Sequence, residues 1–262
     1  MTSISYDDCY NQLLHRAGDP ANAALAQWRR RPGYEHVVEF VTNFSHEYLF
    51  SIGPNDVRSV ISNSSHALGN IQSVEQLFYI EDFTTPFAFQ HLFHWYIEEN
   101  KAIPTWTQFR DWMVEGLAAK YWYVPLKNYL EKHFPNGDRN AWSRAARWRL
   151  GKVYLSNMRE LELLAKLRSL GIPLCYHILA DVLFRVDFWV GNVIVCTYFP
   201  NPNYREGALG RKPPAERFFS DANPPFEIVH MTIERQGFGR VWLASDASIA
   251  NLAATIKSSI EK

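Results

Sequence analysis

The sequence predicts an α+β protein with a helical N-terminal half followed by a small mixed β-sheet. Apolar residues recur three or four positions apart through most of the first half and again from Leu155 to Gly171, which is typical of amphipathic helices. From Phe184 to Val190 they alternate with other residues, which is typical of a strand. Gly191-Asn192 then separates this stretch from a second apolar run, as a two-residue hairpin turn does.

Length and composition indicate a globular chain with a substantial core. The 262 residues are 47% hydrophobic and 15% aromatic. The turn signal Pro135-Asn136-Gly137-Asp138 divides the chain into a helical domain, residues 1–138, and an α/β domain, residues 139–262. No apolar run reaches the roughly 18 to 20 residues that cross a bilayer, so we expect no membrane partner.

The beginning of the chain and its cysteines indicate a cytoplasmic protein. Asp7 and Asp8 stand where a signal peptide has a basic and then an apolar region, so we do not expect export. Cys9, Cys175 and Cys196 form no spaced framework, which favours free thiols in a reducing compartment.

Charge is distributed unevenly between the two predicted domains. Residues 1–138 hold 10 Lys and Arg against 16 Asp and Glu, whereas residues 139–262 hold 17 against 11. The net charge is therefore −6 in the first part and +6 in the second. A basic half of this kind favours a polyanionic partner such as nucleic acid.

Helices separated by Gly and Pro turns are expected throughout the first half. Asp56 is a suitable N-cap, and Thr105 with Gln108 forms a capping-box pattern. The expected helices span Cys9 to Arg16, Ala21 to Arg31, Tyr34 to Phe50, the residues from Val57 on, Ser73 to Phe83, Pro86 to Asn100, Trp106 to Trp122 and Lys127 to Phe134.

Two patterns in these helices have a functional interpretation beside a structural one. Gln108 and Arg110, near the start of their helix, fit a helix-turn-helix reader, although the surrounding tryptophans favour packing. His91, His94 and Glu98 have a spacing that places metal ligands on one helix face, although surface or core-edge histidines are the default interpretation.

The most basic stretch, residues 139–154, predicts a nucleic-acid contact. Guanidinium groups bind phosphates in forked pairs, and tryptophans stack on bases or pack inward. The structural alternative is a solvated helix that Trp142 and Trp148 fix to the core. Together with cations of the loop from Pro200 to Pro225, the candidate nucleic-acid-binding residues are Arg144, Arg147, Arg149, Lys152, Arg205, Arg211 and Arg217.

The hairpin around Gly191-Asn192 has one apolar face and one mixed face. The turn places Val190 opposite Val193, Phe188 opposite Val195 and Asp187 opposite Cys196. The apolar face, which carries Phe184, Val186, Phe188, Val190, Val193, Val195, Thr197 and Phe199, is the predicted core. The mixed face, which carries Arg185, Asp187, Trp189, Ile194, Cys196 and Tyr198, is the predicted site.

A helix with an acidic residue, a three-strand meander with Asp187 on its second strand, and further strands beyond a loop resemble the PD-(D/E)xK nuclease superfamily. Cys196-Thr197-Tyr198 stands where that family has Glu-x-Lys. The resemblance covers residues 155–260 and implies a restriction-endonuclease-like αβββ(α)ββα core. It also implies Mg²⁺ held by two carboxylates, with a lysine that orients the attacking water. Asp187 matches one carboxylate; Glu160, Glu162, Lys212 and Arg211 are candidates for the missing groups.

The end of the chain is predicted to hold a second hairpin and a helix. The hairpin consists of Phe226 to Arg235 and Arg240 to Ser245, and the helix, Ile249 to Ile260, begins at Asp246 or Ser248.

Two functions fit this sequence. The first is a nucleic-acid-associated protein, on DNA rather than RNA, whose Asp187, Glu160, Glu162 and Lys212 carry out Mg²⁺-dependent phosphodiester hydrolysis, by analogy in a prokaryotic defence or mobile-element system. The second is a non-catalytic subunit that binds nucleic acid or a protein partner. Motifs of serine hydrolases, phosphate-binding loops, dinucleotide-binding folds and zincins are absent from the sequence.

Overall fold

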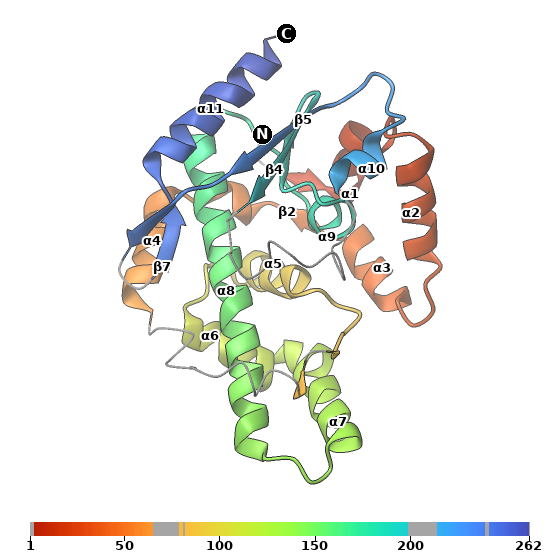
Figure 1. The fold of residues 1–262 in the computed structure, drawn as a ribbon, viewed down its shortest axis with the longest axis vertical. Coiled ribbons are helices and arrows are strands. Elements are labelled where there is room, and N and C mark those ends of the chain that lie inside the picture. Colours follow the sequence, from red (N-terminus) through yellow and green to blue (C-terminus); the bar gives the residue numbers. More distant parts are fainter. Residues whose placement is uncertain (1–2, 65–78, 81, 199–213, 239–240, 262) are drawn as a thin grey trace. The chain divides into compact units, whose positions relative to one another are not determined.

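The computed structural model of the chain describes residues 3–64, 79–80, 82–198, 214–238 and 241–261, and it has the predicted α+β class (Figure 1). Its contacts divide the chain into two compact units. Unit 1 consists of Met1–Pro54 and Glu160–Lys262, and unit 2 consists of Asn55–Arg159. The predicted boundary after residue 138 lies inside unit 2, just before the long helix α8 (Arg139–Ser169).

The N-terminal elements of unit 1 are β1 (Ile4–Ser5), α1 (Tyr6–Cys9), a π-helical turn (Tyr10–Leu14), α2 (Asp19–Arg29), α3 (Glu35–Thr42), β2 (Ser45–His46) and a 3-10 turn (Tyr48–Ser51). The single helix predicted from Tyr34 to Phe50 is wrong, because α3 ends at Thr42. The following residues instead form β2, in which fully buried His46 pairs with Ile4 of β1.

Unit 2 is built from α4 (Pro54–Asn63), α5 (Phe89–Asn100), α6 (Trp106–Val114), a 3-10 turn (Leu117–Tyr121), α7 (Tyr123–His133) and the first part of α8. The predicted helix from Ser73 to Phe83 falls largely outside the described residues. The predicted capping box is confirmed: the Gln108 amide donates to the Thr105 hydroxyl and the Gln108 side chain accepts from the Thr105 amide.

The helix predicted from Trp106 to Trp122 is interrupted at Gly116. A Cβ atom at this glycine would lie 2.8 Å from the Cα and carbonyl oxygen of Trp112, so the chain folds back at a point that only glycine allows. Trp106 and Phe109 are buried, which assigns α6 to the core rather than to a base-reading surface. His91 and His94 of α5 are buried as well, and His91 Nδ1 accepts from the Ala88 amide.

Unit 1 contains the small mixed sheet, with strand order β3-β4-β5. Strands β3 (Phe188–Val190) and β4 (Val193–Tyr198) form the predicted antiparallel hairpin, in which Phe188 pairs with Val195 and Val190 pairs with Val193. Cys175 adds a single antiparallel bridge to Trp189 of β3. Strand β5 (Glu227–Thr232) pairs with β4 in parallel.

Two predictions about this sheet are wrong. The strand expected from Phe184 begins only at Phe188, because α9 (Ile178–Phe184) precedes it. This helix is capped by His177, whose Nδ1 accepts from the Leu179 amide, and it ends at Arg185 with φ +64°. The apolar Phe184 is buried against Phe218 and Phe219 from the end of that helix, so it satisfies the burial pattern without being in a strand.

The second correction concerns the C-terminal hairpin. Strand β5 does not belong to it; the hairpin consists of β6 (Arg235–Phe238) and β7 (Val241–Ala244), and the turn between them lies outside the described residues. The last predicted helix is α11 (Asp246–Ile260), which starts three residues before Ile249. Its N-cap is Ser245, whose hydroxyl accepts from the Ser248 amide at 3.1 Å, so neither Asp246 nor Ser248 is the capping residue.

Helices cover both faces of the sheet. On one face α11 packs against β4 and β5, and the Ser259 hydroxyl donates to Glu227 at 2.7 Å (Figure 1). On the opposite face α10 (Ala215–Phe219) contributes Glu216, which pairs with His230. Trp189 and Ile194, predicted on a mixed face, are therefore fully buried. The polar part of that face is limited to the carboxyl end of β4.

Candidate functional site

Asp187 lies in the bend between α9 and β3, and its principal partner is Thr197 of β4. One carboxylate oxygen, Oδ2, accepts from the Thr197 amide at 2.6 Å and from the Thr197 hydroxyl at 2.7 Å. The Asp187 amide donates to the Val195 carbonyl rather than joining a regular pair with Cys196. The ladder therefore ends at Phe188, and the predicted pairing of Asp187 with Cys196 is wrong.

The surroundings of Asp187 disfavour its ionised form. Burial raises the pKa of this carboxyl; the two bonds from Thr197 and the charges of Arg185 and His230 lower it but do not offset the burial. A Mg²⁺ ligand is an ionised carboxylate with open oxygens. Here the carboxylate has a raised pKa and one oxygen that already accepts two hydrogen bonds.

Glu160, the other predicted metal ligand, and Asp187 both act electrostatically on the buried Tyr176. This tyrosine donates its hydroxyl to Asp181 Oδ2 at 3.0 Å. Burial raises the pKa of Tyr176, and the charges of Asp181, Glu160 and Asp187 raise it further. Asp181, which has no motif around it in the sequence, is thus in direct contact with the phenol.

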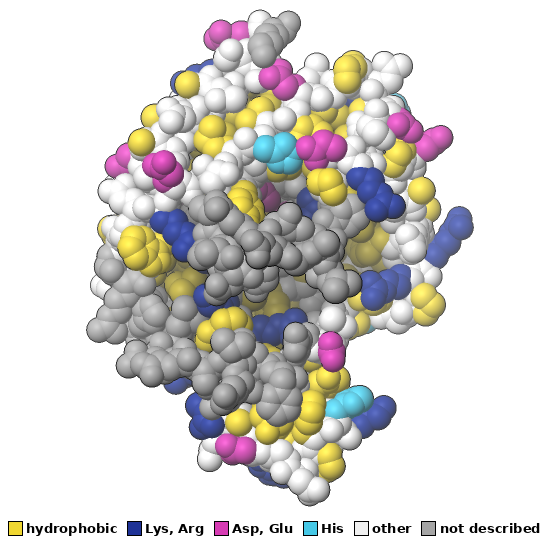
Figure 2. Space-filling view, in the orientation of Figure 1, with side chains coloured by type: hydrophobic (Ala, Val, Ile, Leu, Met, Phe, Trp, Pro, Cys, Tyr) yellow, Lys and Arg dark blue, Asp and Glu magenta, His cyan; other side chains and the backbone are white. Residues whose placement is uncertain are grey.

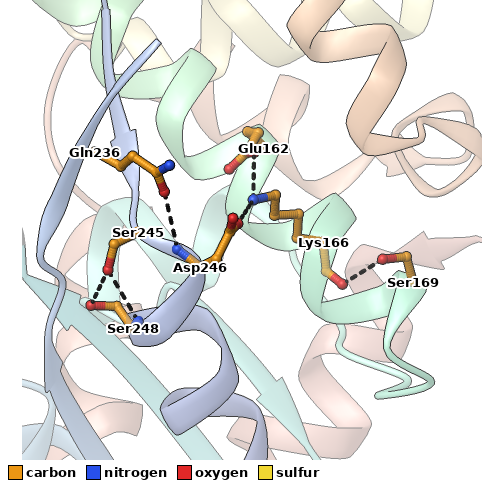
Figure 3. A network of polar contacts seen from close by, with 7 residues as sticks. All are labelled: Glu162, Lys166, Ser169, Gln236, Ser245, Asp246 and Ser248. Carbon is orange, nitrogen blue, oxygen red and sulfur yellow. Dashed lines mark hydrogen bonds and ion pairs between the residues drawn. The ribbon is translucent and has the colours of Figure 1, made fainter.

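Glu162 has a different environment from Glu160, because residues two apart on a helix point to different sides. Its fully buried side chain pairs with Lys166 at 3.4 Å, and Lys166 pairs with Asp246 of α11 at 2.6 Å (Figure 3). Gln236, Ser245 and Ser248 complete the same network at the start of α11. Glu162 therefore joins α8 to α11 rather than contributing to the surroundings of Asp187.

The carboxyl ends of β4 and β5 carry a second polar group. Cys196 and His230 are neighbours across the parallel ladder, and His230 pairs with Glu216 of α10. Burial raises the pKa of the Cys196 thiol, as do the charges of Asp187 and Glu216. The thiol donates to the Arg185 carbonyl at 3.3 Å, so it is protonated and is a poor metal ligand and nucleophile. Sequence spacing gave no signal for Glu216 and His230, which only the strand pairing brings to Cys196.

The basic residues of α8 divide into structural and exposed ones. Arg149 donates to the carbonyl oxygens of Ile80 and Phe83, both at 2.8 Å, and burial lowers the pKa of its guanidinium. Its predicted role as a phosphate ligand is therefore wrong. Arg144, Arg147 and Lys152 are exposed.

The two tryptophans of this stretch also differ. Trp142 is buried against the turn that precedes α8: a Cβ atom at Gly137 would lie 2.5 Å from its indole nitrogen. Trp142 therefore fixes this turn and offers no stacking surface. Trp148 is half-buried, and Lys152 lies over its ring at 5.3 Å from the centroid.

The remaining predicted cations lie in or beside the segment 199–213. Arg205, Arg211 and Lys212 are outside the described residues, whereas Arg217 is exposed on α10. Figure 2 shows described Lys and Arg side chains interspersed with acidic, neutral and apolar ones on the face that it presents. Unit 1 also has three consecutive exposed cations, Arg29, Arg30 and Arg31, where α2 ends.

The metal site that the nuclease resemblance implies does not fit the described residues. Within these residues, no group of three or more His, Cys, Asp or Glu side chains is arranged to hold a metal ion. The Thr197 hydroxyl already donates a hydrogen bond to the Asp187 carboxylate. The protonated thiol of Cys196 stands at the position of the second carboxylate. Across the same part of the chain, no helix has both the length and the hydrophobicity needed to span a membrane.

Comparisons of the chain with protein-family models, with curated proteins and with solved structures found no significant match. The functional argument therefore depends on the residues of this chain and their geometry.

Lys166 provides a test of the role assigned to Glu162. We expect Lys166→Met to destabilise the protein by about 3 kcal/mol, because it leaves the buried Glu162 carboxylate without its cation. Urea denaturation measures this loss. In the double variant Glu162→Gln with Lys166→Met, most of the stability should return. Asp246→Asn is the matched control and should cost under about 1 kcal/mol, because Asp246 is an exposed partner.

Asp187 should make stability depend on pH in a direction opposite to that of an ordinary paired carboxylate. Its folded pKa is raised above the unfolded value of about 3.9, so the folded protein keeps the proton to higher pH than the unfolded chain does. Stability contributed by this proton is present below pH 4 and is lost as pH rises through the folded pKa. Urea denaturation between pH 4 and 8 should show this slope in the wild type.

Two substitutions separate the charge of Asp187 from its hydrogen bonds. Asp187→Asn keeps an acceptor for Thr197, so it should be at least as stable as the wild type at pH 7 and lack the slope. Asp187→Ala should lose about 1–3 kcal/mol, because both Thr197 donors lose their acceptor. An Asn variant as unstable as the Ala variant would contradict the assignment.

Proposed function

We propose that this protein binds nucleic acid, DNA in preference to RNA, and that its nuclease-like core is a non-catalytic scaffold. The observation that carries the first part is the group of exposed cations Arg144, Arg147 and Lys152 on α8. The positive net charge of residues 139–262 supports the same partner. By analogy with the nuclease superfamily, the setting we propose is a prokaryotic defence or mobile-element system, with a protein partner in a complex.

The three cations lie close together along the axis of α8. Arg144 and Arg147 are three residues apart and share a helix face, whereas Lys152, five residues beyond Arg147, is turned about 140° from it. Arg144 and Arg147 can therefore contact one phosphate backbone together, and Lys152 extends the positive charge around the helix. Arg144 already pairs with Asp138 at 3.5 Å, but both side chains are about half exposed. An exposed pair of this kind is worth little and can be exchanged for a phosphate.

The scaffold role is supported by what surrounds Asp187. Helix α8, the Cys175 bridge, β3, β4, α10 and the parallel β5 follow in an order similar to that of the nuclease superfamily, with the additional helix α9 between Cys175 and β3. At the positions of the family's Glu and Lys this chain has Cys196 and Tyr198, and the Asp187 carboxylate is held by Thr197. These residues preserve a folded sheet end and lack the open carboxylate pair that hydrolysis requires.

A metal-dependent hydrolase is the second candidate, and one observation favours it. The charges of Glu160, Asp181 and Asp187 all raise the pKa of Tyr176, so both predicted ligands and a third carboxylate act on one buried phenol. Lys212, the candidate for orienting water, belongs to the segment outside the described residues, so its position neither supports nor opposes this function.

Binding should depend on the cations of α8. A variant with Gln at positions 144, 147 and 152 should bind a fluorescein-labelled 20-base-pair duplex at least several-fold more weakly than the wild type. Its plot of log affinity against log salt should be less steep by up to about 0.9 for each phosphate that the variant no longer neutralises, because fewer counterions are released. Fluorescence anisotropy between 50 and 200 mM NaCl measures both quantities.

A matched control changes the same number of charges in unit 2. Lys120, Lys127 and Lys132, exposed near and on α7, are replaced by Gln in one variant. This control should bind like the wild type. Equal reductions in affinity in the two variants would show that only the net charge of the protein matters for binding. An unchanged affinity in the α8 variant would contradict the proposed binding surface.

The scaffold role predicts no hydrolysis. We expect the purified wild type to leave single- and double-stranded DNA and RNA intact with 10 mM Mg²⁺ or Mn²⁺, as judged by denaturing electrophoresis. The opposite result would be cleavage by the wild type that is lost in Asp187→Asn and in Glu160→Gln while both variants stay folded. That result would contradict the scaffold role and support the hydrolase.

A further inference from the structure

The hairpin of β6 and β7 exposes a tryptophan on an otherwise small-residue face. Trp242 is 57% exposed, the highest value among the large hydrophobic side chains that the structure describes. It pairs across the ladder with Gly237, and Arg235 pairs with Ala244. Since directly paired residues share a face, Trp242, Gly237, Arg235 and Ala244 lie together on one side of the hairpin.

The Trp242 indole packs over the backbone of Gly237. A Cβ atom at Gly237 would lie 3.7 Å from Trp242 Cζ3, an ordinary contact distance, so the ring is close to the hairpin backbone. No side chain at Gly237 covers it. The neighbouring cation on the same face is Arg235, in a diagonal position within reach of a long side chain.

The hairpin is held firmly from its other end. The Ser245 amide donates to the Glu234 carbonyl at 2.8 Å, and the Glu234 amide donates to the Ser248 hydroxyl at 2.9 Å. Gln236 accepts from the Asp246 amide at the start of α11 (Figure 3). The opposite face of the hairpin carries Leu243, which is buried. Trp242 is therefore held on an anchored element and not on a free loop.

We propose that this face is a stacking platform for an unpaired base of single-stranded nucleic acid, with the base on the Trp242 indole and the adjoining phosphate on Arg235. An exposed indole offers a flat surface on which any base stacks, and a guanidinium beside it matches the charge of the backbone. Trp142 is buried and Trp148 is half-buried with Lys152 over its ring, whereas Trp242 is exposed, so we assign the stacking function expected of the basic stretch to Trp242. This inference rests on the proposed nucleic-acid binding and adds a preference for single strands.

Anisotropy with a fluorescein-labelled 20-nucleotide single strand and with the matched duplex tests the proposal. Trp242→Ala should bind the single strand about tenfold more weakly than the wild type, because one base loses its aromatic partner. Trp242→Phe should retain most of the affinity, since a smaller ring still stacks. Duplex affinity should stay within about twofold in both variants, because the α8 cations bind phosphates in either form of DNA.

Intrinsic fluorescence supplies a readout that a merely structural tryptophan would not change. Titration with the unlabelled single strand should quench the wild type more than Trp242→Phe, and the difference between the two titrations reports the stacked indole. Arg235→Gln should lower the salt slope for the single strand by about 0.7, because one phosphate is no longer neutralised.

Leu117→Ala is the matched control, because Leu117 is similarly exposed, at 56%, in unit 2. It should bind both ligands like the wild type, and circular dichroism should show all variants folded. If the wild type binds nucleic acid and Trp242→Ala leaves the single-strand affinity unchanged, the stacking platform is contradicted and the proposed function is not. A folded wild type that binds neither the strand nor the duplex at 50 mM NaCl would overturn the proposed function and the platform with it.

Discussion

Unit 1 depends on the enclosure of the first half of β4. This strand pairs with β3 on one edge and with β5 on the other. Pairing on both edges gives the strand backbone hydrogen-bond partners inside the protein, so the buried side chains of Val193, Ile194 and Val195 can be fully apolar. A strand buried on both faces reads as a continuous apolar run, which is how VIV appears in this sequence.

The same enclosure determines the chemistry at the end of the strand. Where the helices no longer cover β4, Cys196 and Thr197 meet Asp187, and each polar group there is partly dehydrated. Dehydration raises the pKa values of the Asp187 carboxyl and the Cys196 thiol, which disfavours the charged form of each. Both groups make hydrogen bonds at this end of the sheet, Asp187 with Thr197 and Cys196 with the Arg185 carbonyl. The electrostatics thus agree with a scaffold more than with a hydrolytic centre.

Helix α8 carries both buried charged residues with structural partners and exposed charged residues. Arg149 and Glu162 face inward, and each is held by specific partners: Arg149 by two carbonyl groups of unit 2 and Glu162 by Lys166 of unit 1. Arg144, Arg147 and Lys152 face solvent on the same helix. Sequence spacing does not separate these groups, because the helix passes from one unit to the other and its buried face changes along its length.

Local sequence determined much of the secondary structure. The capping box of Thr105 with Gln108 and the Gly191-Asn192 turn are each decided by a few neighbouring residues, and each was predicted correctly. The register of β3 and β4 followed from the turn for the same reason. The α+β class followed from the sum of such local patterns.

Tertiary structure alone decided which of these elements meet. The parallel pairing of β5 with β4 joins residues about 34 positions apart, and it brings His230 and Glu216 to Cys196 without any local motif. Whether the apolar Phe184 ended a helix or began a strand depended on the aromatic side chains of α10, since both elements bury it equally well. The partner of Asp187 likewise depended on the bend at the sheet edge. Residue 187 was expected opposite Cys196, and in the structure its carboxylate accepts hydrogen bonds from Thr197.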